Sequence, residues 1–124
     1  MSELRIKQRI TTMDELLNTL RQFAAERDWD QFHSPKNLSM ALAVEASELL
    51  EIFQWMQESE SLAPNAVTRE RIAEELADVF VYCLLMSNKL DIDLLQAAQS
   101  KMRKNAEKYP ADKVKGSNKK YTEY

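Results

Sequence analysis

The sequence predicts an all-α protein, and composition, chain length and hydrophobic pattern all favour this class. One Gly and three Pro leave few residues that favour turns, whereas the helix formers Leu, Ala, Glu, Lys, Gln and Met are abundant. No stretch shows the alternation of apolar and polar residues that is typical of a half-buried strand. A chain of 124 residues, 44% of them hydrophobic, has the size and apolar content of one domain. We therefore expect residues 1–124 to form a single all-α domain resembling a four-helix bundle.

Capping signals mark the first two helices. Thr12, with a glutamate three residues later, forms a capping box, and the apolar spacing behind it predicts a helix over about 13–27. Ser34 and Pro35 suit the N-cap and first position of the next helix. Its apolar-rich run predicts a helix over 35–56, which a polar segment then ends.

Two more helices and a tail complete the predicted fold. The third helix is expected over about 68–89. The fourth should begin with Asp91 or Asp93 as its N-cap and end at about Lys108, where Tyr109 and Pro110 stop it. The last fifteen residues, about 110–124, have no apolar periodicity, so we expect an extended basic arm. Composition alone fits a disordered tail equally well.

The charge is small overall but unevenly placed. The net charge is −3, yet residues 101–120 hold eight Lys or Arg against Glu107 and Asp112, a local charge of +6 that leaves −9 for the remainder. Such a basic segment could bind nucleic acid or could bring positive charge to a phosphorylated ligand. Charge alone does not choose between these two classes.

Cysteine content and apolar run length indicate the cellular setting. Cys83 is the only cysteine, so no internal disulfide can form, and its apolar neighbours suggest a small core side chain. No apolar stretch reaches the roughly 18 residues of a membrane helix, and the N-terminus lacks the apolar core of a signal peptide. We expect a soluble cytoplasmic protein with no membrane partner.

Four acidic residues fall on the apolar faces of the second and third predicted helices. Glu45 and Glu48 are three residues apart on one helix, and Glu75 and Asp78 repeat this spacing on the other. At about 100° per residue, Glu45 and Glu75 lie in the middle of apolar stripes, with Glu48 and Asp78 about 60° to one side. An unpaired ionised carboxylate in such a place is strongly disfavoured because it loses hydration.

Two kinds of compensation are consistent with this pattern. Salt bridges to Arg69, Arg71 or Lys101, or protonation, could satisfy one or two of the acids, and a buried ion-pair network stays open as the alternative. A divalent cation could satisfy all four, because carboxylates three residues apart can hold one ion or adjacent ions. Oxygen ligands favour Mg²⁺ or Mn²⁺ over zinc, and the chain has no Glu-x-x-His pair for a di-iron site. Mg²⁺ with open positions suits phosphoanhydride cleavage.

These acids belong to a longer pattern that resembles a known family. The pairs Glu45-x-x-Glu48 and Glu75-x-x-Asp78 resemble those of the all-α MazG-type nucleoside triphosphate pyrophosphohydrolases. The blocks "FAAERDWDQFHSPKNLSMALAVEASELLEIFQW", "EELADVFVYCLL", "SKMRKNAEKYP" and "KGSNKKYTE" resemble the dCTP pyrophosphatase branch of that family. The resemblance covers roughly residues 13–123. It implies a MazG-type fold.

The resemblance implies an activity and a metal. The reaction would be hydrolysis of dCTP, or of a modified relative, between the α- and β-phosphates, giving the monophosphate and pyrophosphate in nucleotide pool sanitation. The acids that match the family's Mg²⁺ ligands are Glu45, Glu48, Glu75 and Asp78, with Mn²⁺ as a substitute ion. Glu51 continues the same register as a metal helper or water-orienting base, or as a solvated acid.

The resemblance also implies a set of substrate-binding residues. Trp29 and Trp55 would face the base. Trp55 follows Glu48 by seven residues, a spacing that places both on the same side of a helix. Without the resemblance to the family, either Trp could instead be a core residue. His33 would touch the ligand or cap local backbone. The remaining residues predicted to contact the nucleotide are Lys36, Asn37, Tyr82, Lys101, Asn105, Tyr109, Lys120 and Tyr121.

Related enzymes are dimers paired into tetramers, so we expect a homodimer or homotetramer, with the basic arm ordered near a neighbouring active site. The chain departs from the family in two places. Val44 precedes Glu45 where many MazG-type proteins have a second acid, which favours the dCTP branch. Leu20 stands where some dCTP enzymes present a polar residue, often His, so one contact to the base edge would be missing here.

Two rival functions remain open from the sequence. One is a relaxed pyrophosphatase, or one tuned to dUTP or another triphosphate. The other is a noncatalytic helical oligomer whose acids form ion pairs and whose basic arm binds nucleic acid. We favour the enzyme and do not expect a nucleic-acid partner.

Overall fold

The computed structural model describes residues 6–123, and in these residues all regular structure is helical. The helices in chain order are α2 (Met13–Glu26), η1 (Asp30–Phe32), α3 (Pro35–Phe53), α4 (Glu58–Ser61), α5 (Ala66–Lys89), α6 (Leu94–Lys108), α7 (Ala111–Val114) and η2 (Tyr121–Glu123). The predicted all-α class is confirmed. The chain divides into two compact units, Met1–Asp91 and Ile92–Tyr124.

Helix α2 begins where the capping box predicts. The Thr12 hydroxyl accepts a hydrogen bond from the Glu15 backbone N–H at 3.2 Å, and the Glu15 carboxylate accepts one from the Thr11 N–H at 3.1 Å. The helix ends at Glu26, after which Asp28 takes a positive φ of 53°. That turn lets the Trp29 N–H donate to the Ala24 carbonyl at 2.9 Å, so the chain folds back along α2.

Helix α3 begins as predicted and ends earlier. The Ser34 hydroxyl caps it by accepting from the Asn37 N–H at 3.2 Å, and Pro35 takes the first position. The last helical residue is Phe53 rather than Met56. Trp55 consequently lies in the turn after the helix, which the apolar pattern did not reveal.

The starts of α5 and α6 are fixed by side-chain caps. Asn65 accepts from the Thr68 N–H at 2.9 Å, so α5 begins at Ala66, two residues before the predicted start. Asp93 accepts from the Gln96 N–H at 3.1 Å and is the N-cap of α6. The alternative cap, Asp91, instead has a positive φ of 52° in the turn that ends α5.

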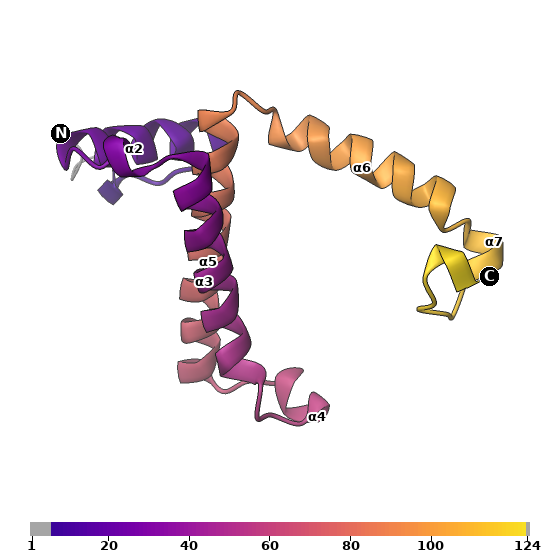
Figure 1. Cartoon of the computed structure of the whole chain (residues 1–124). Helices are drawn as coiled ribbons and strands as arrows, with labels where there is room; N and C mark the ends of the chain where they lie inside the picture. The colour runs from indigo at the N-terminus through magenta and orange to yellow at the C-terminus, as the bar shows by residue number, and fades with distance from the viewer. Residues whose placement is uncertain (1–5, 124) are drawn as a thin grey trace. The chain divides into compact units, whose positions relative to one another are not determined.

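The first unit is built around α3 and α5, which run side by side (Figure 1), while α2 also packs against α5. The most buried apolar side chains are Leu38 on α3 and Leu84 on α5, with 1% and 2% of their surface exposed. The same two helices also carry exposed apolar side chains. Those exposed by more than half on α3 and α5 are Met40, Val44, Leu50, Val67 and Leu76.

The second unit contains α6 and the C-terminal segment. Helix α6 ends at Lys108, with Tyr109 as its C-cap. The segment predicted as an extended arm is not extended throughout, because it contains the short helical turns α7 and η2. Gly116 supplies the positive φ of 79° between them. The expected arm therefore includes short helical turns, because local i→i+3 and i→i+4 hydrogen bonds form there without any apolar periodicity.

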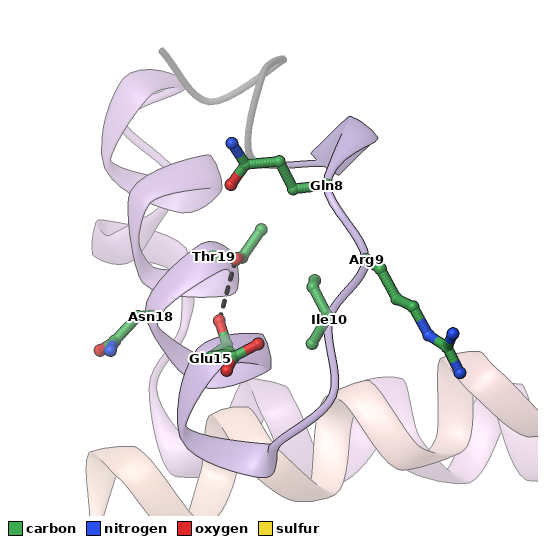
Figure 2. A pocket seen from close by; sticks show the side chains of 6 residues that line it. All are labelled: Gln8, Arg9, Ile10, Glu15, Asn18 and Thr19. Carbon is green, nitrogen blue, oxygen red and sulfur yellow. Dashed lines mark hydrogen bonds between the residues drawn. The ribbon is translucent and has the colours of Figure 1, made fainter.

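A cavity of about 240 Å³ opens between the N-terminal segment and the start of α2. Figure 2 shows its lining side chains: Gln8, Arg9, Ile10, Glu15, Asn18 and Thr19. Polar groups here serve the local fold, since the Thr19 hydroxyl donates to the Glu15 carbonyl at 2.9 Å. None of the predicted site residues lines it. No helix within residues 6–123 is both long and apolar enough to cross a membrane.

Candidate metal centre and nucleobase cavity

Three of the four predicted acids converge between α3 and α5. Glu45 and Glu48 on α3 and Glu75 on α5 each offer a carboxylate oxygen, and these oxygens lie within 4.8 Å of one another. We call these three residues the acidic cluster. Asp78 follows Glu75 by nearly one helical turn, and its negative charge acts on both Glu45 and Glu75.

The pKa values of the acidic cluster reflect burial and mutual repulsion. The pKa of Glu45 is raised to about 7. Burial is the largest cause, followed by the hydrogen bond with Glu48 and the negative charge of Glu48. The charges of Asp78 and Glu75 act in the same direction. Burial, followed by the hydrogen bond with Glu48 and its negative charge, also raises the pKa of Glu75. Burial, followed by the charges of Glu45, Asp78 and Glu48, raises the pKa of the Tyr82 hydroxyl. This part of the protein therefore favours added positive charge.

The acidic cluster contains polar atoms without a protein partner. The Oε2 atoms of Glu45 and Glu75 are buried and have no hydrogen-bond partner. In the described residues, ion pairs join Lys89 to Asp30 and Arg27 to Glu26, and neither pair involves the acidic cluster. Buried oxygens that neither a donor nor a cation satisfies are costly. Hard oxygen donors at this spacing fit a divalent cation such as Mg²⁺ or Mn²⁺.

A cavity of about 180 Å³ lies beside the acids, between α2, α5 and the loop that joins α2 to α3. Asp78 belongs to its wall, so the cavity adjoins the acids. Its remaining lining residues are Leu20, Phe23, Ala24, Trp29, His33, Val81, Tyr82 and Leu85. The Phe23 and Trp29 rings meet edge to face, with centroids 5.7 Å apart. A mostly apolar cavity lined by aromatic side chains can take an aromatic ring.

The structure brings some predicted substrate-binding residues to this cavity. Trp29, His33 and Tyr82 line it. Leu20 also lines it, so the residue flagged as a departure from the family is part of the cavity wall. Sequence reasoning missed Phe23, Val81 and Leu85, because their apolar spacing is the same as that of ordinary core residues.

Other predicted residues lie elsewhere. Trp55 is 89% exposed and lies in the turn after α3, beyond the end of a helix that was predicted to reach Met56. Its contact with the base stays a prediction. The Asn37 side-chain amide donates to the Phe32 carbonyl at 3.0 Å and serves the local backbone. Lys36 in the first turn of α3 and Glu51 further along it are exposed.

The remaining predicted nucleotide contacts belong to the second unit. Lys101 and Asn105 are exposed on α6, and Tyr109 is its C-cap. The Lys120 backbone N–H donates to the Glu123 carboxylate at 2.6 Å. The side chain of Tyr121 lies outside the described part of the chain. Their contact with the nucleotide stays a prediction.

Paired acids on two packed helices define an all-α, carboxylate-rich site of the kind that the sequence predicted. A sequence model of the MazG-like family matches residues 40–124. The chain belongs to the MazG-like family.

Individual relatives place the chain more closely within that family. It is 43% identical over 114 residues to dCTP pyrophosphatase 1 from Homo sapiens, covering 90% of this chain and 67% of that protein. The Mus musculus protein of the same name is 42% identical over 114 residues, which cover 90% of this chain and 67% of that protein. A crystal structure of a pyrophosphatase from Archaeoglobus fulgidus superposes with a TM-score of 0.76 at 38% identity, covering 83% of this chain and 96% of that one. The predicted resemblance to the dCTP pyrophosphatase branch is confirmed.

Proposed function

We propose that this protein is a Mg²⁺-dependent nucleoside triphosphate pyrophosphohydrolase that converts dCTP or a modified dCTP to the monophosphate and pyrophosphate. The observation that carries the proposal is the acidic cluster, whose carboxylate oxygens lie within 4.8 Å of one another beside an aromatic cavity. The names of the relatives, dCTP pyrophosphatase 1 and a pyrophosphatase, support the reaction.

The acidic residues divide into those that hold the ion and those that act near it. Glu45, Glu48 and Glu75 would hold Mg²⁺, with Asp78 at the border between the metal and the nucleobase cavity. When bound, Mg²⁺ supplies charge neutralisation of the triphosphate and activation of a water molecule. Glu51, exposed on the same helix, is our candidate for orienting that water. No protein nucleophile is required.

The cavity between α2 and α5 would bind the base. Trp29 and Tyr82 offer ring surfaces, and His33 offers a ring nitrogen that can hydrogen-bond to a base edge. Leu20 offers no hydrogen bond, so discrimination between cytosine and other bases rests on fewer polar contacts than a polar residue there would give. A relaxed profile, or preference for dUTP or another triphosphate, is the alternative within the same class.

We propose that Lys36, Lys101 and Lys120 supply positive charge to the phosphates. Asn105, Tyr109 and Tyr121 would supply hydrogen bonds, with residues 1–124 as one functional domain. Trp55, in the turn after α3, would contact the base from that turn. Exposed apolar side chains on α3 and α5, among them Val44, Leu50 and Leu76, support a homodimer or homotetramer. The setting we propose is the cytoplasmic nucleotide pool.

A triphosphate panel tests the proposal directly. The eight common nucleoside and deoxynucleoside triphosphates are incubated with Mg²⁺ or with EDTA, and products are separated by anion-exchange chromatography. We expect dCMP and pyrophosphate from dCTP, only with Mg²⁺. Diphosphate plus phosphate as products, or activity in EDTA, would contradict the mechanism. A flat profile would contradict the base preference alone.

A matched pair of variants on α5 links the activity to the acidic cluster. Glu75→Gln should remove nearly all turnover, because it takes one of the three converging carboxylates away from the ion. Glu74→Gln changes the neighbouring exposed glutamate and should leave turnover close to wild type. Tight, salt-sensitive nucleic-acid binding with no turnover would instead favour the noncatalytic oligomer.

A further inference from the structure

The loop between α2 and α3 carries one wall of the nucleobase cavity. Its single helical turn, η1, has Trp29 as N-cap and His33 as C-cap, and both rings line the cavity. Asp30 is the first residue of that turn. The Phe32 N–H donates to the Trp29 carbonyl at 2.9 Å, and the His33 N–H donates to the Asp30 carbonyl at 3.1 Å. Because these bonds tie the turn together, a shift of Asp30 moves both rings.

The opposite wall of the cavity belongs to α5. Asp78, Tyr82 and Leu85 come from this helix, and its last residue is Lys89. The Lys89 ammonium lies 2.7 Å from the Asp30 carboxylate and donates a hydrogen bond to it. This ion pair therefore joins the two walls directly. The loop is also held to α2, through the Trp29 N–H and the Ala24 carbonyl at 2.9 Å.

A second, smaller cavity shows that the ion pair borders the base site. Its volume is about 80 Å³, and Asp30 and Lys89 line it together with His33 and Leu85, which also line the larger cavity. Near it, the Arg21 guanidinium donates to the Asn88 side-chain oxygen and ties α2 to α5. The helical frame is thus fixed separately, and the Asp30 contact holds the loop to α5.

The pair contributes to geometry more than to folding. The Asp30 side chain is 72% exposed and the Lys89 side chain 26% exposed. The hydrogen bond from Lys89, followed by its charge, holds the pKa of the Asp30 carboxyl below its usual range, so the pair is intact at neutral pH. Exposed ion pairs add little to global stability, so loss of this one should leave the fold in place.

We infer that Asp30 and Lys89 are positioning residues that hold the Trp29 and His33 wall against α5 and so set the fit of the base. The inference rests on the proposed function, because it requires the cavity to bind a nucleobase. Neither residue belongs to the acidic cluster. Loss of the pair should therefore weaken nucleotide binding while the chemistry at the metal continues.

The test compares KM and kcat for dCTP in Lys89→Met and Asp30→Asn with those of the wild type. We expect KM to rise about three- to fivefold, the range that loss of an exposed pair allows, with kcat changed less than about twofold. Inorganic tripolyphosphate, which has no base, should inhibit the variants and the wild type equally. Lys7→Met, which removes an exposed lysine elsewhere in the same unit, should leave KM unchanged.

Two additional comparisons separate positioning from a general structural effect. The charge-reversed double variant Asp30→Lys with Lys89→Asp should recover most of the wild-type KM. In about 0.5 M NaCl, the ratio of variant to wild-type KM should approach one, because salt screens an exposed pair. Should Lys89→Met fail to fold, Lys89→Arg keeps the charge and should keep KM near the wild-type value, and Asp30→Asn removes the pair.

The outcomes distinguish this inference from the function on which it rests. Active wild-type protein whose KM for dCTP does not change in Lys89→Met or Asp30→Asn overturns the inference alone. A parallel change in tripolyphosphate inhibition also overturns it, since the effect would then concern phosphate charge rather than the base. Wild-type protein that hydrolyses no triphosphate overturns the proposed function and the inference together.

Discussion

Metal binding by the acidic cluster should release protons near neutral pH. Glu45 is the informative group, because burial and the neighbouring Glu48 raise its pKa from 4.5 to about 7 in the metal-free protein. A cation must displace the proton before it can use that carboxylate. Glu75 has a pKa shifted in the same direction and adds to the effect. The apparent metal affinity should therefore rise with pH across this window.

The size of the effect follows from the pKa of Glu45. With a pKa of about 7, Glu45 is roughly nine-tenths protonated at pH 6 and roughly one-tenth protonated at pH 8. Linkage through this one proton predicts that the apparent Mn²⁺ affinity rises about tenfold between these pH values. At pH 7, each ion bound should release about half a proton from Glu45.

Isothermal titration calorimetry measures both quantities. Mn²⁺ is titrated at pH 6, 7 and 8 in pairs of buffers with different ionisation enthalpies, so that the number of released protons is obtained directly. Glu45→Gln should bind more weakly and lose most of the pH dependence, whereas Glu74→Gln should behave as the wild type. Equal affinity at pH 6 and pH 8, with no proton release, would refute the reasoning.

Three other predictions concern stability. In EDTA, the thermal midpoint of unfolding should rise as pH falls from about 8 to 5. The reason is that folded Glu45 and Glu75 have raised pKa values and take up protons before the unfolded chain does. Scanning fluorimetry that shows the midpoint falling over this range would contradict this. Leu38→Ala should lower the free energy of unfolding, measured by urea denaturation, by about 2–5 kcal/mol, because the Leu38 side chain is only 1% exposed. A change below about 1 kcal/mol would contradict full burial. Ser34→Ala should cost about 1 kcal/mol in the same assay, because the Asn37 N–H loses its cap, and Ser34→Asp should restore most of it.

The helix starts could be predicted because their causes are local. The caps at Thr12 and Ser34 are hydrogen bonds between residues only three apart in the sequence, and both are present in the structure. The start of α5 was misplaced because Asn65, outside the apolar run, accepts from the Thr68 N–H. The sequence left Asp91 and Asp93 equivalent as N-caps, and backbone conformation decides between them.

The candidate site was predictable where it depends on helical spacing and not where it depends on helix ends or loops. Glu45, Glu48 and Glu75 were found because acids within apolar stripes contradict ordinary burial preferences. The end of α3 was predicted at Met56 instead of Phe53 because a helix boundary is poorly encoded in apolar periodicity. The contact between Asp30 and Lys89 spans 59 residues of sequence, and no local pattern encodes it.

The most direct measurement of the central claim is the position of the ion. A crystal soaked with Mn²⁺ and measured near the manganese absorption edge should show an anomalous peak within ligand distance of the carboxylate oxygens of Glu45, Glu48 and Glu75. These oxygens lie within 4.8 Å of one another without an ion, so little rearrangement is needed. Carboxylates that point apart, or that pair with lysine or arginine with no anomalous peak between them, would contradict the account.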